Sequence, residues 1–322
     1  MIEKDFLSLE RLTRDELEEF FLITDLLRRD SIYQPLKGKS AALIFQKPSL
    51  RTRVSFEVGV CQLGGHPIFL SQEGVGIGTR EKASDVARLL SRFTQLIVAR
   101  LYDHEILLEL AEYASVPVIN ALTDLSHPCQ ILADMYTLRQ HGRLAPGIKI
   151  VFVGDGNNVV RSWLEMACIF PMRFVLAAPR GYDPDPAILR KVRQSTESTV
   201  EIVRRAEEAV AGADVVYTDV WTSMGQEKEM AARKKAFAKF KVTKSLMALA
   251  KFDCLFMHCL PAHRGEEVTE EVLEGGQSIV FDEAENRLHV QKAVMARLLG
   301  FRYSGAGRAT TLRHVAGAGG KR

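Results

Sequence analysis

The sequence predicts an α/β protein built from two similar domains, each a mostly parallel sheet flanked by helices. Short apolar runs alternate with amphipathic helical patterns along most of the 322 residues, which is typical of right-handed βαβ units. This alternation is interrupted once, at 141–147 (HGRLAPG), where a helix stop precedes a Pro-Gly turn. A chain of this length can also bury two hydrophobic cores.

The first half of the chain opens with a helical pattern over 13–29, in which Thr13 and Glu16 have the spacing of a capping box. Strands and helices then alternate, and Ser84 is a candidate N-cap of one of the helices. The expected strands are 41–45, 66–70, 95–100 and 116–122, and the expected helices are 49–65, 82–93, 104–114 and 127–142.

The second half repeats the plan from residue 148, with a glycine turn after its first strand. Residues 303–322 are Gly/Ala-rich and basic without periodicity, so we expect a flexible tail there. The expected strands are 148–153, 174–179, 214–221, 254–261 and 277–283, and the expected helices are 158–170, 207–213, 227–239 and 285–300.

Composition and charge exclude several classes of protein. The formal net charge of +3 is too small to indicate nucleic-acid binding or attachment to a membrane surface. The five cysteines lack C-x-x-C spacing, so neither a disulfide framework nor a zinc site is indicated, and free thiols fit a reducing compartment. Without an N-terminal apolar region or a run of membrane-spanning length, we expect a cytoplasmic protein.

Polar, charged or glycine residues follow six of the expected strands. Ligands of open parallel sheets bind outside the carboxyl ends of the strands, so six such clusters predict a site. They are KPSLRTR (47–53), RLYDH (100–104), TDLSHPCQ (123–130), DGNN (155–158), DVWTSMG (219–225) and HCLPAHRG (258–265).

The segment KPSLRTR by itself has two readings. Ser49 can cap a helix whose first N–H groups, with Arg51 and Thr52, form a phosphate-sized anion seat. The alternative is a capped helix with a solvated basic first turn. Basic side chains at this end oppose the helix dipole unless an anion compensates them.

Two further clusters offer ligands for an amide or an amino acid. His127 and Gln130 are three apart on one helical face and can hold a carbonyl oxygen and an amide, although an isolated histidine is more often a capping residue. GDGNN suggests a dinucleotide turn and hence an NAD(P)-dependent dehydrogenase, but Val159 stands where the third glycine belongs. Asn157 and Asn158 suit a zwitterionic amino acid instead.

The last two clusters contain the remaining reactive groups. Asp219 can pair with a ligand amine, or act as an N-cap or in a loop salt bridge. Cys259 with His258 and His263 is compatible with a nucleophilic Cys-His pair, a buried strand terminus or, least favoured, a zinc site. Because the zinc site is the least favoured alternative and the dinucleotide fingerprint is incomplete, we expect neither a metal nor a cofactor.

Taken together, the motifs resemble those of the ornithine branch of the aspartate/ornithine carbamoyltransferase family, over about residues 5–300. KPSLRTR and HPCQ resemble the two carbamoyl-phosphate motifs of the whole family. DVWTSMGQE and HCLPAHRG resemble the ornithine-binding loop and turn, which the aspartate enzymes lack. All four motifs occur in order, with GDGNN between them.

The resemblance implies a role for each matching residue. Ser49, Leu50, Arg51, Thr52, Arg100, His127 and Gln130 would bind carbamoyl phosphate, Leu50 only through its backbone N–H because it replaces the usual threonine. Asn158, Asp219, Ser223, Met224, Cys259, Leu260 and Arg287 would form the ornithine side. Arg100, His127, Asp219 and Cys259 would be the catalytic residues.

The resemblance also implies an architecture. The carbamoyl-phosphate domain would cover 1–141 and the ornithine domain 142–290, and a final helix over 291–302 would cross back to the first domain and pair with the first helix. Relatives are trimers or assemblies of trimers, so a homotrimer is expected. Gly76 stands where relatives often carry a glutamine that reaches the neighbouring subunit, which puts that contact in doubt, and Arg161 replaces a smaller polar residue or histidine.

The implied reaction transfers the carbamoyl group of carbamoyl phosphate to the side-chain amine of L-ornithine, giving L-citrulline and phosphate. Arg100, His127 and Thr52 would stabilise the oxyanion, and Asp219 and Cys259 would orient the amine. Close alternatives are transfer to putrescine or to an N-acylated ornithine. A catalytically silent relative is disfavoured because Arg51, His127 and Asp219 are all present.

Overall fold

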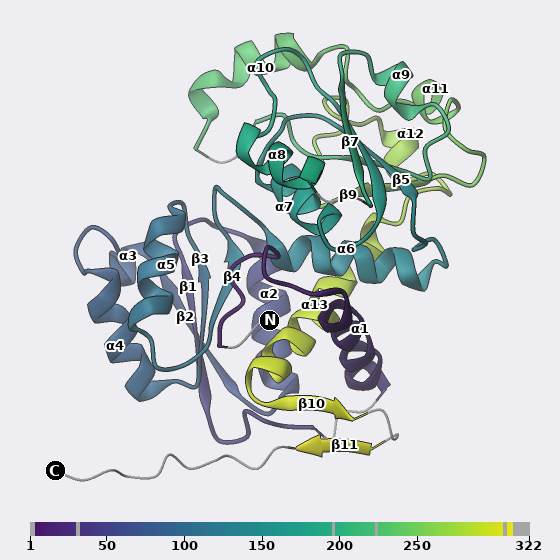
Figure 1. Cartoon of the computed structure of the whole chain (residues 1–322). Coiled ribbons are helices and arrows are strands. Elements are labelled where there is room, and N and C mark those ends of the chain that lie inside the picture. Colours follow the sequence, from purple (N-terminus) through teal and green to yellow (C-terminus); the bar gives the residue numbers. More distant parts are fainter. Residues whose placement is uncertain (1–3, 30–32, 195–196, 223–224, 305–307, 312–322) are drawn as a thin grey trace, which may run out of the picture.

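Each half of the chain contains one parallel sheet (Figure 1). This computed structural model describes residues 4–29, 33–194, 197–222, 225–304 and 308–311. The first sheet has the strand order β2-β1-β3-β4 and the second β7-β6-β5-β8-β9. Every strand pair in both sheets is parallel. The predicted fold class is therefore confirmed.

The first domain carries a hydrophobic core on each face of its sheet. Successive side chains of a strand point to opposite faces, so Ala42 and Ile44 pack under α4 and α5 whereas Leu43 and Phe45 pack on the side of α1 and α2. Its strands are β1 (Ser40–Phe45), β2 (His66–Ser71), β3 (Leu96–Arg100) and β4 (Val118–Leu122), and its helices are α1 (Arg14–Arg29), α2 (Leu50–Gln62), α3 (Gln72–Val75), α4 (Ala83–Phe93), α5 (His104–Tyr113) and α6 (Pro128–Gln140).

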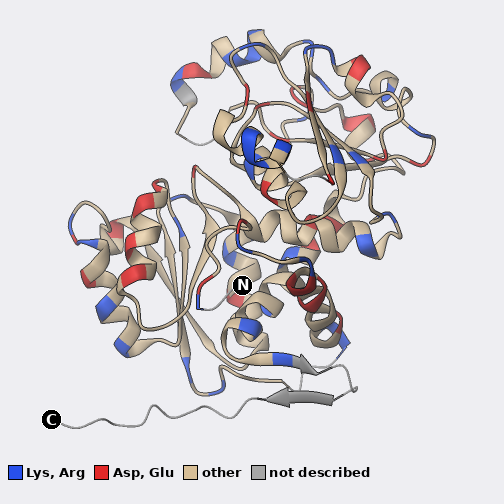
Figure 2. Cartoon of the chain, in the orientation of Figure 1, with Lys and Arg blue, Asp and Glu red and all other residues tan. Residues whose placement is uncertain are grey.

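The second domain has the same layered plan (Figure 1), and basic and acidic residues are spread over both domains (Figure 2). Its strands are β5 (Ile148–Val153), β6 (Met172–Ala177), β7 (Thr199–Val203), β8 (Val215–Thr218) and β9 (Leu255–His258). Its helices are α7 (Asn158–Ala167), α8 (Pro186–Gln194), α9 (Ala206–Val210), η1 (Glu227–Glu229), α10 (Met230–Phe237), α11 (Lys244–Met247) and α12 (Glu270–Leu273). The sequence patterns missed α8 and β7. Strand β7 lies at the edge of its sheet with both faces partly exposed, so its sequence has little apolar periodicity.

The long helix α13 (Val280–Leu298) returns the chain to the first domain, where it packs against α1, α2 and α6 (Figure 1). The crossing back is confirmed. A boundary between residues 290 and 291 falls inside this helix, and the exact domain limits stay predictions. Beyond α13, strand β10 (Phe301–Ser304) pairs antiparallel with β11 (Arg308–Thr311), so part of the segment 303–322, expected to be a flexible tail, is paired. Residues 305–307 and 312–322 of that segment lie outside the described residues.

Two local predictions are wrong. Residues 277–283 were expected to form a strand, but only Ser278 bridges to Phe256 and the helix begins at Val280. The buried face of this part of α13 is polar, including Glu283 and Asn286, so the apolar period of a helix is hidden. Ser84 is no N-cap either: Lys82 holds that position without a side-chain hydrogen bond, and the N–H of Ser84 donates to Glu109. The capping box of Thr13 and Glu16, by contrast, is confirmed.

Candidate active site

A cavity of about 860 Å³ lies between the two domains, at the carboxyl ends of strands β1, β3, β4, β5, β8 and β9. Residues from all six clusters line it, as the sequence predicted. From the first domain come Arg51, Arg100 and Gln130, and from the second Asp219 and Cys259.

The first-domain wall begins at the N-terminus of α2. Ser49 is the N-cap, and its hydroxyl accepts a hydrogen bond from the backbone N–H of Thr52 at 3.3 Å. Leu50, the first residue of α2, has an apolar side chain that is 74% exposed, so it offers a ligand only its backbone N–H at this end of the helix. The helix end therefore presents backbone N–H groups beside the cavity, as an anion seat requires.

Thr52 lies behind this surface and holds two arginines. Its buried Oγ1 accepts from Nη1 of Arg100 at 3.2 Å and from Nη2 of Arg287 at 2.7 Å. The side chain of Thr52 does not line the cavity, whereas both arginines do. The geometry thus gives Thr52 a positioning contact, and it brings Arg287 beside Arg100. The expected role of Arg287 on the ornithine side stays a prediction.

Four cationic side chains gather on this wall: Lys47, Arg51, Arg100 and Arg287. Burial, followed by the charges of Arg287 and Arg51, lowers the pKa of Arg100 to about 9. Lys47 is 3% exposed, pairs with Asp124 and lies over the ring of Tyr102 at 4.4 Å. Crowded cations destabilise one another unless an anion is present, so this wall suits a phosphate.

His127 and Gln130 complete the first-domain wall. Burial, and then the charges of Arg287 and Arg100, hold the pKa of His127 well below its ordinary value, so the ring is neutral near pH 7. The backbone N–H of His127 donates to Oγ of Ser162 on α7 at 2.8 Å. Nε2 of Gln130 donates hydrogen bonds to Oδ1 of Asp134 and to Oε1 of Glu283, both at 2.9 Å.

Several buried polar atoms of this wall have no hydrogen-bond partner within the described residues. Buried polar groups are nearly always satisfied in folded proteins, so such atoms on the wall of a cavity are available to hydrogen-bond a ligand. They are Nε of Arg51, Nε of Arg100, Nε of Arg287, Nδ1 of His127 and Oε1 of Gln130.

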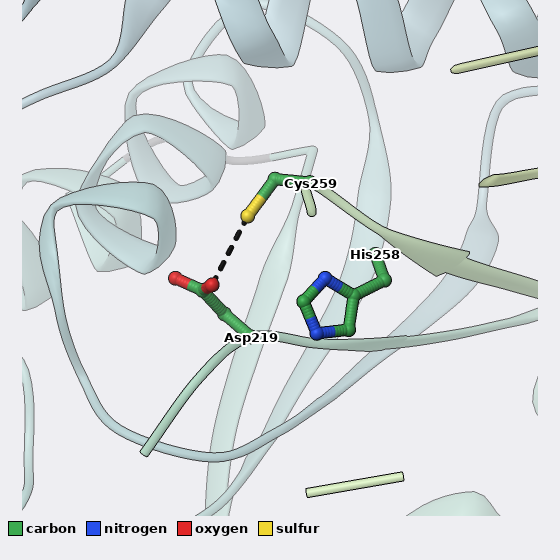
Figure 3. A group of neighbouring side chains, drawn as sticks. All are labelled: Asp219, His258 and Cys259. Carbon is green, nitrogen blue, oxygen red and sulfur yellow. Dashed lines mark hydrogen bonds between the residues drawn. The ribbon is translucent and has the colours of Figure 1, made fainter. Parts of the chain in front are cut away.

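The second-domain wall is centred on Asp219, beside the end of β8, and its groups already have partners. Oδ1 of Asp219 accepts from Sγ of Cys259 at 3.1 Å, as Figure 3 shows, and from the N–H of Val220 at 2.8 Å. Oδ2 accepts from Nδ2 of Asn157 at 2.8 Å. Burial, followed by the charges of Asp219 and Glu283, raises the pKa of Cys259 well above its ordinary value, so its thiol is protonated.

His258 does not activate Cys259. Its Nδ1 accepts from the N–H of Leu260 at 2.8 Å, and its Nε2 lies 3.2 Å from Oε1 of Glu267. With both ring nitrogens engaged, His258 neither takes the thiol proton nor offers a lone pair to a metal, although Asp219, His258 and Cys259 lie close together (Figure 3). This geometry therefore does not favour His258 as the base of a nucleophilic Cys-His pair, and His263 lines the cavity with its Nδ1 4.0 Å from Oε2 of Glu267.

Two asparagines join this wall to its surroundings. Asn157 caps α7 through Oδ1, which accepts from the N–H groups of Val159 and Val160. Asn158 lines the cavity, and its Nδ2 donates to the carbonyl of Thr123 in the first domain at 2.7 Å. The sequence pointed to both residues, but only the structure shows that Asn157 orients Asp219.

The turn after β9 has an unusual backbone. Leu260 has a φ of 55°, in the left-handed region that a branched side chain rarely occupies. Such a conformation persists where the surrounding structure imposes it, which is common at functional sites. Leu260 and Cys259 both line the cavity, whereas Ser223 and Met224, also expected to bind ornithine, lie outside the described residues.

The remaining sequence observations have plain structural outcomes. Gly76 has a φ of 66°, and a Cβ there would lie 2.7 Å from Cβ of Arg80, so a glutamine at this position would be strained. Arg161 joins the domains by pairing with Glu10 at 3.1 Å, and it also pairs with Glu165 on its own helix at 3.2 Å. Arg53 pairs with Glu57 on its own helix, and its guanidinium lies over the ring of Phe69, away from the cavity wall.

The sequence patterns did not indicate the ion pairs that Arg233 forms at the cavity wall. Arg233 on α10 is buried and donates to Asp155 at 2.7 Å, to Glu229 at 2.9 Å and to the carbonyl of Trp221 at 3.1 Å. The only available signal was an arginine in a Lys/Ala-rich helix, which is usually solvated. Arg233 thereby ties the loop after β8 to the glycine turn after β5.

Comparison with known proteins identifies both halves of the chain. Residues 4–140 match the family model described as "Aspartate/ornithine carbamoyltransferase, carbamoyl-P binding domain", and residues 146–298 match "Aspartate/ornithine carbamoyltransferase, Asp/Orn binding domain". The ornithine carbamoyltransferase of Chlorobaculum tepidum is 53% identical over 92% of this chain and 90% of its own length. The chloroplastic ornithine carbamoyltransferase of Pisum sativum is 49% identical over 92% of this chain and 80% of its own length.

The fold agrees with the sequence comparison. The crystal structure of the ornithine carbamoyltransferase from Pyrococcus furiosus superposes with a TM-score of 0.88 at 44% identity, and covers 93% of this chain and 99% of that chain.

Proposed function

This chain belongs to the aspartate/ornithine carbamoyltransferase family, and from that premise we propose that it transfers the carbamoyl group of carbamoyl phosphate to the side-chain amine of L-ornithine. The products are L-citrulline and phosphate, in a step of arginine metabolism. The observation that carries this proposal is the cavity between the domains, which has a cationic wall on one side and a carboxylate on the other.

The first-domain wall binds carbamoyl phosphate. The phosphate is bound by the N-terminus of α2, with Ser49, Leu50 through its backbone, and Arg51. Thr52 holds Arg100 and Arg287 beside the carbamoyl group. His127 and Gln130 offer it Nδ1 and Oε1, two atoms without partners among the described residues.

The second-domain wall binds ornithine. Asp219 supplies the carboxylate, and Asn157 and Cys259 hold it in place. Asn158, Leu260 and the loop with Ser223 and Met224 complete the amino-acid side. A protonated Cys259 acts here as a hydrogen-bond donor and not as a nucleophile.

The chemistry is acyl transfer to an amine. The side-chain amine of ornithine is mostly protonated near neutral pH, as that of lysine is, so the wall around Asp219 and Cys259 must receive or orient the neutral form. Its attack on the carbonyl carbon forms a C–N bond and builds negative charge on the carbonyl oxygen, where Arg100 and Arg287 stabilise it. The C–O bond to phosphate then breaks, and phosphate leaves against Arg51 and the end of α2. The attacking nitrogen gives up its extra proton to the departing phosphate, which balances the reaction.

Citrulline formation tests this function. The protein should form citrulline from carbamoyl phosphate and L-ornithine, and should carbamoylate putrescine and N-acetyl-L-ornithine far more slowly. A faster reaction with either alternative amine would contradict the assignment of the substrate. Failure to carbamoylate any of the three would contradict the function itself.

We also propose that the chain forms a homotrimer in the cytoplasm. An exposed apolar stripe of Leu50, Val54 and Val58 on α2 supports assembly, because residues four apart share one helical face. Among the described residues, no helix is long and apolar enough to cross a bilayer. Light scattering should give about three times the chain mass of 36.0 kDa, and a monomer would contradict the trimer.

A further inference from the structure

Two buried carboxyl groups meet behind Gln130, at the junction of the domains. Asp134 lies one turn after Gln130 on α6, Glu283 lies in the first turn of α13, and neither side chain is exposed. Nε2 of Gln130 donates to Oδ1 of Asp134 and to Oε1 of Glu283, both at 2.9 Å. A primary amide has two N–H donors, so these contacts use both.

These contacts decide which atom of Gln130 faces the cavity. The nitrogen must lie against the carboxyl oxygens because they accept hydrogen bonds, and Oε1 is then directed away from them. Gln130 lines the cavity, and its Oε1 has no partner among the residues that the structure describes. Oε1 is thereby presented as an acceptor for the –NH₂ of a carbamoyl group.

Glu283 also reaches the second domain. Its Oε2 accepts from the backbone N–H of His258 at 3.0 Å, and its Oε1 accepts from the hydroxyl of Tyr217 on β8 at 3.1 Å. His258 ends β9 and directly precedes Cys259 in the turn that faces the amine. Glu283 therefore contacts Gln130 and also the backbone that leads directly to Cys259. Asp134 likewise bonds Gln130, and it reaches the second domain through the side chain of Tyr217.

The pair tolerates burial because it does not carry two full charges. Burial raises the pKa of Asp134 to about 7, and burial together with the charge of Asp134 raises the pKa of Glu283 well above its ordinary value. Two carboxyl groups in contact and away from water retain a proton between them. Arg287, one turn further along α13, is the nearby cation that favours the remaining negative charge.

We propose that Glu283 is the positioning residue that couples the two half-sites through the backbone of His258, and that Asp134 acts on the carbamoyl half by orienting Gln130. The inference rests on the proposed function, which supplies the ligand of each half. When carbamoyl phosphate binds Gln130, Glu283 transmits the constraint to the backbone of His258 and so to the turn of Cys259 and Leu260.

Calorimetry with two unreactive analogues measures this coupling. Phosphonoacetamide replaces the labile anhydride oxygen of carbamoyl phosphate by CH₂, and L-norvaline is ornithine without its side-chain amine. In the wild-type protein, bound phosphonoacetamide should strengthen norvaline binding at least about fivefold, and norvaline should strengthen phosphonoacetamide binding by the same factor.

Two substitutions separate the roles of the pair. In Glu283→Gln a single carbonyl oxygen must serve donors on Gln130, His258 and Tyr217, so the coupling factor should fall to near one. In Asp134→Asn, phosphonoacetamide should bind about tenfold more weakly, because one hydrogen bond between Gln130 and a carboxyl group is lost, but the coupling factor should persist. Glu165→Gln removes another buried carboxyl group between the domains, outside the cavity, and should change neither quantity.

The inference is overturned if Glu283→Gln keeps the wild-type coupling, if Asp134→Asn or Glu165→Gln loses as much of it, or if a wild-type protein that forms citrulline shows no coupling. Should Glu283→Gln fail to fold, Glu283→Asp keeps the carboxyl group but shortens its reach. Loss of coupling in that variant supports the inference, and retained coupling overturns it. A wild-type protein that forms no citrulline contradicts the proposed function instead.

Discussion

The two walls of the cavity differ in how many of their polar groups already have partners. On the first-domain wall, buried nitrogens of three arginines and of His127 have no hydrogen-bond partner among the described residues. On the second-domain wall, both oxygens of Asp219 accept hydrogen bonds from neighbours. The first wall is thus built around an anion that must be supplied, whereas the second holds a preorganised carboxylate for an incoming amine.

The largest expected effect comes from removing a cation of the first wall. Arg51→Ala should lower kcat/KM for carbamoyl phosphate by about 10²–10³, equivalent to about 2.7–4 kcal/mol, since a preorganised donor to a developing anion is lost. Steady-state kinetics with each substrate varied in turn measures the change. An Arg51→Ala protein with a normal KM for carbamoyl phosphate would show that the phosphate lies elsewhere.

The second wall should respond with the opposite substrate dependence. Asp219→Ala should raise KM for ornithine about tenfold or more, because a charged hydrogen-bond acceptor is removed, and should leave the affinity for carbamoyl phosphate nearly unchanged. The same kinetic series provides the measurement. Equal losses for the two substrates would contradict the separation of the walls.

A smaller effect is expected from the residue behind the first wall. Thr52→Val keeps the shape of the side chain but removes the acceptor shared by Arg100 and Arg287. KM for carbamoyl phosphate should rise about tenfold, the cost of a hydrogen bond to a charged group. Ser55→Ala, which removes a hydroxyl donating to the carbonyl of Thr52 on the same helix, is the matched control and should leave KM unchanged. Similar KM values for both variants would remove Thr52 from the account.

The last prediction concerns stability outside both walls, where no change in the kinetics is expected. Burial raises the pKa of Glu165 from 4.5 to about 7, so the stability that this group contributes is fully present below pH 4.5 and is lost as the pH rises through about 7. Glu165→Gln removes the titration, so its free energy of unfolding should depend less on pH between pH 5 and 7.5 than that of the wild type. Urea denaturation at several pH values measures both slopes, and identical slopes would contradict the buried carboxyl.

The sequence predicted the architecture and most of the cavity wall because strand ends in parallel sheets share one edge. It placed KPSLRTR, HPCQ, GDGNN and HCLPAHRG at that edge, and the structure brings them together. It could not place contacts between residues far apart in the chain, such as Thr52 with Arg287 or Gln130 with Glu283. The start of α13 was read as a strand because polar residues occupy its buried face.

Binding of phosphonoacetamide to three proteins tests the division of the cavity most directly. Isothermal titration should give the same dissociation constant for the wild type and for Asp219→Ala, and a loss of about a hundredfold or more for Arg51→Ala. That result would place the anion on the first-domain wall alone. Equal binding by Arg51→Ala and the wild type, or a comparable loss in Asp219→Ala, would contradict it.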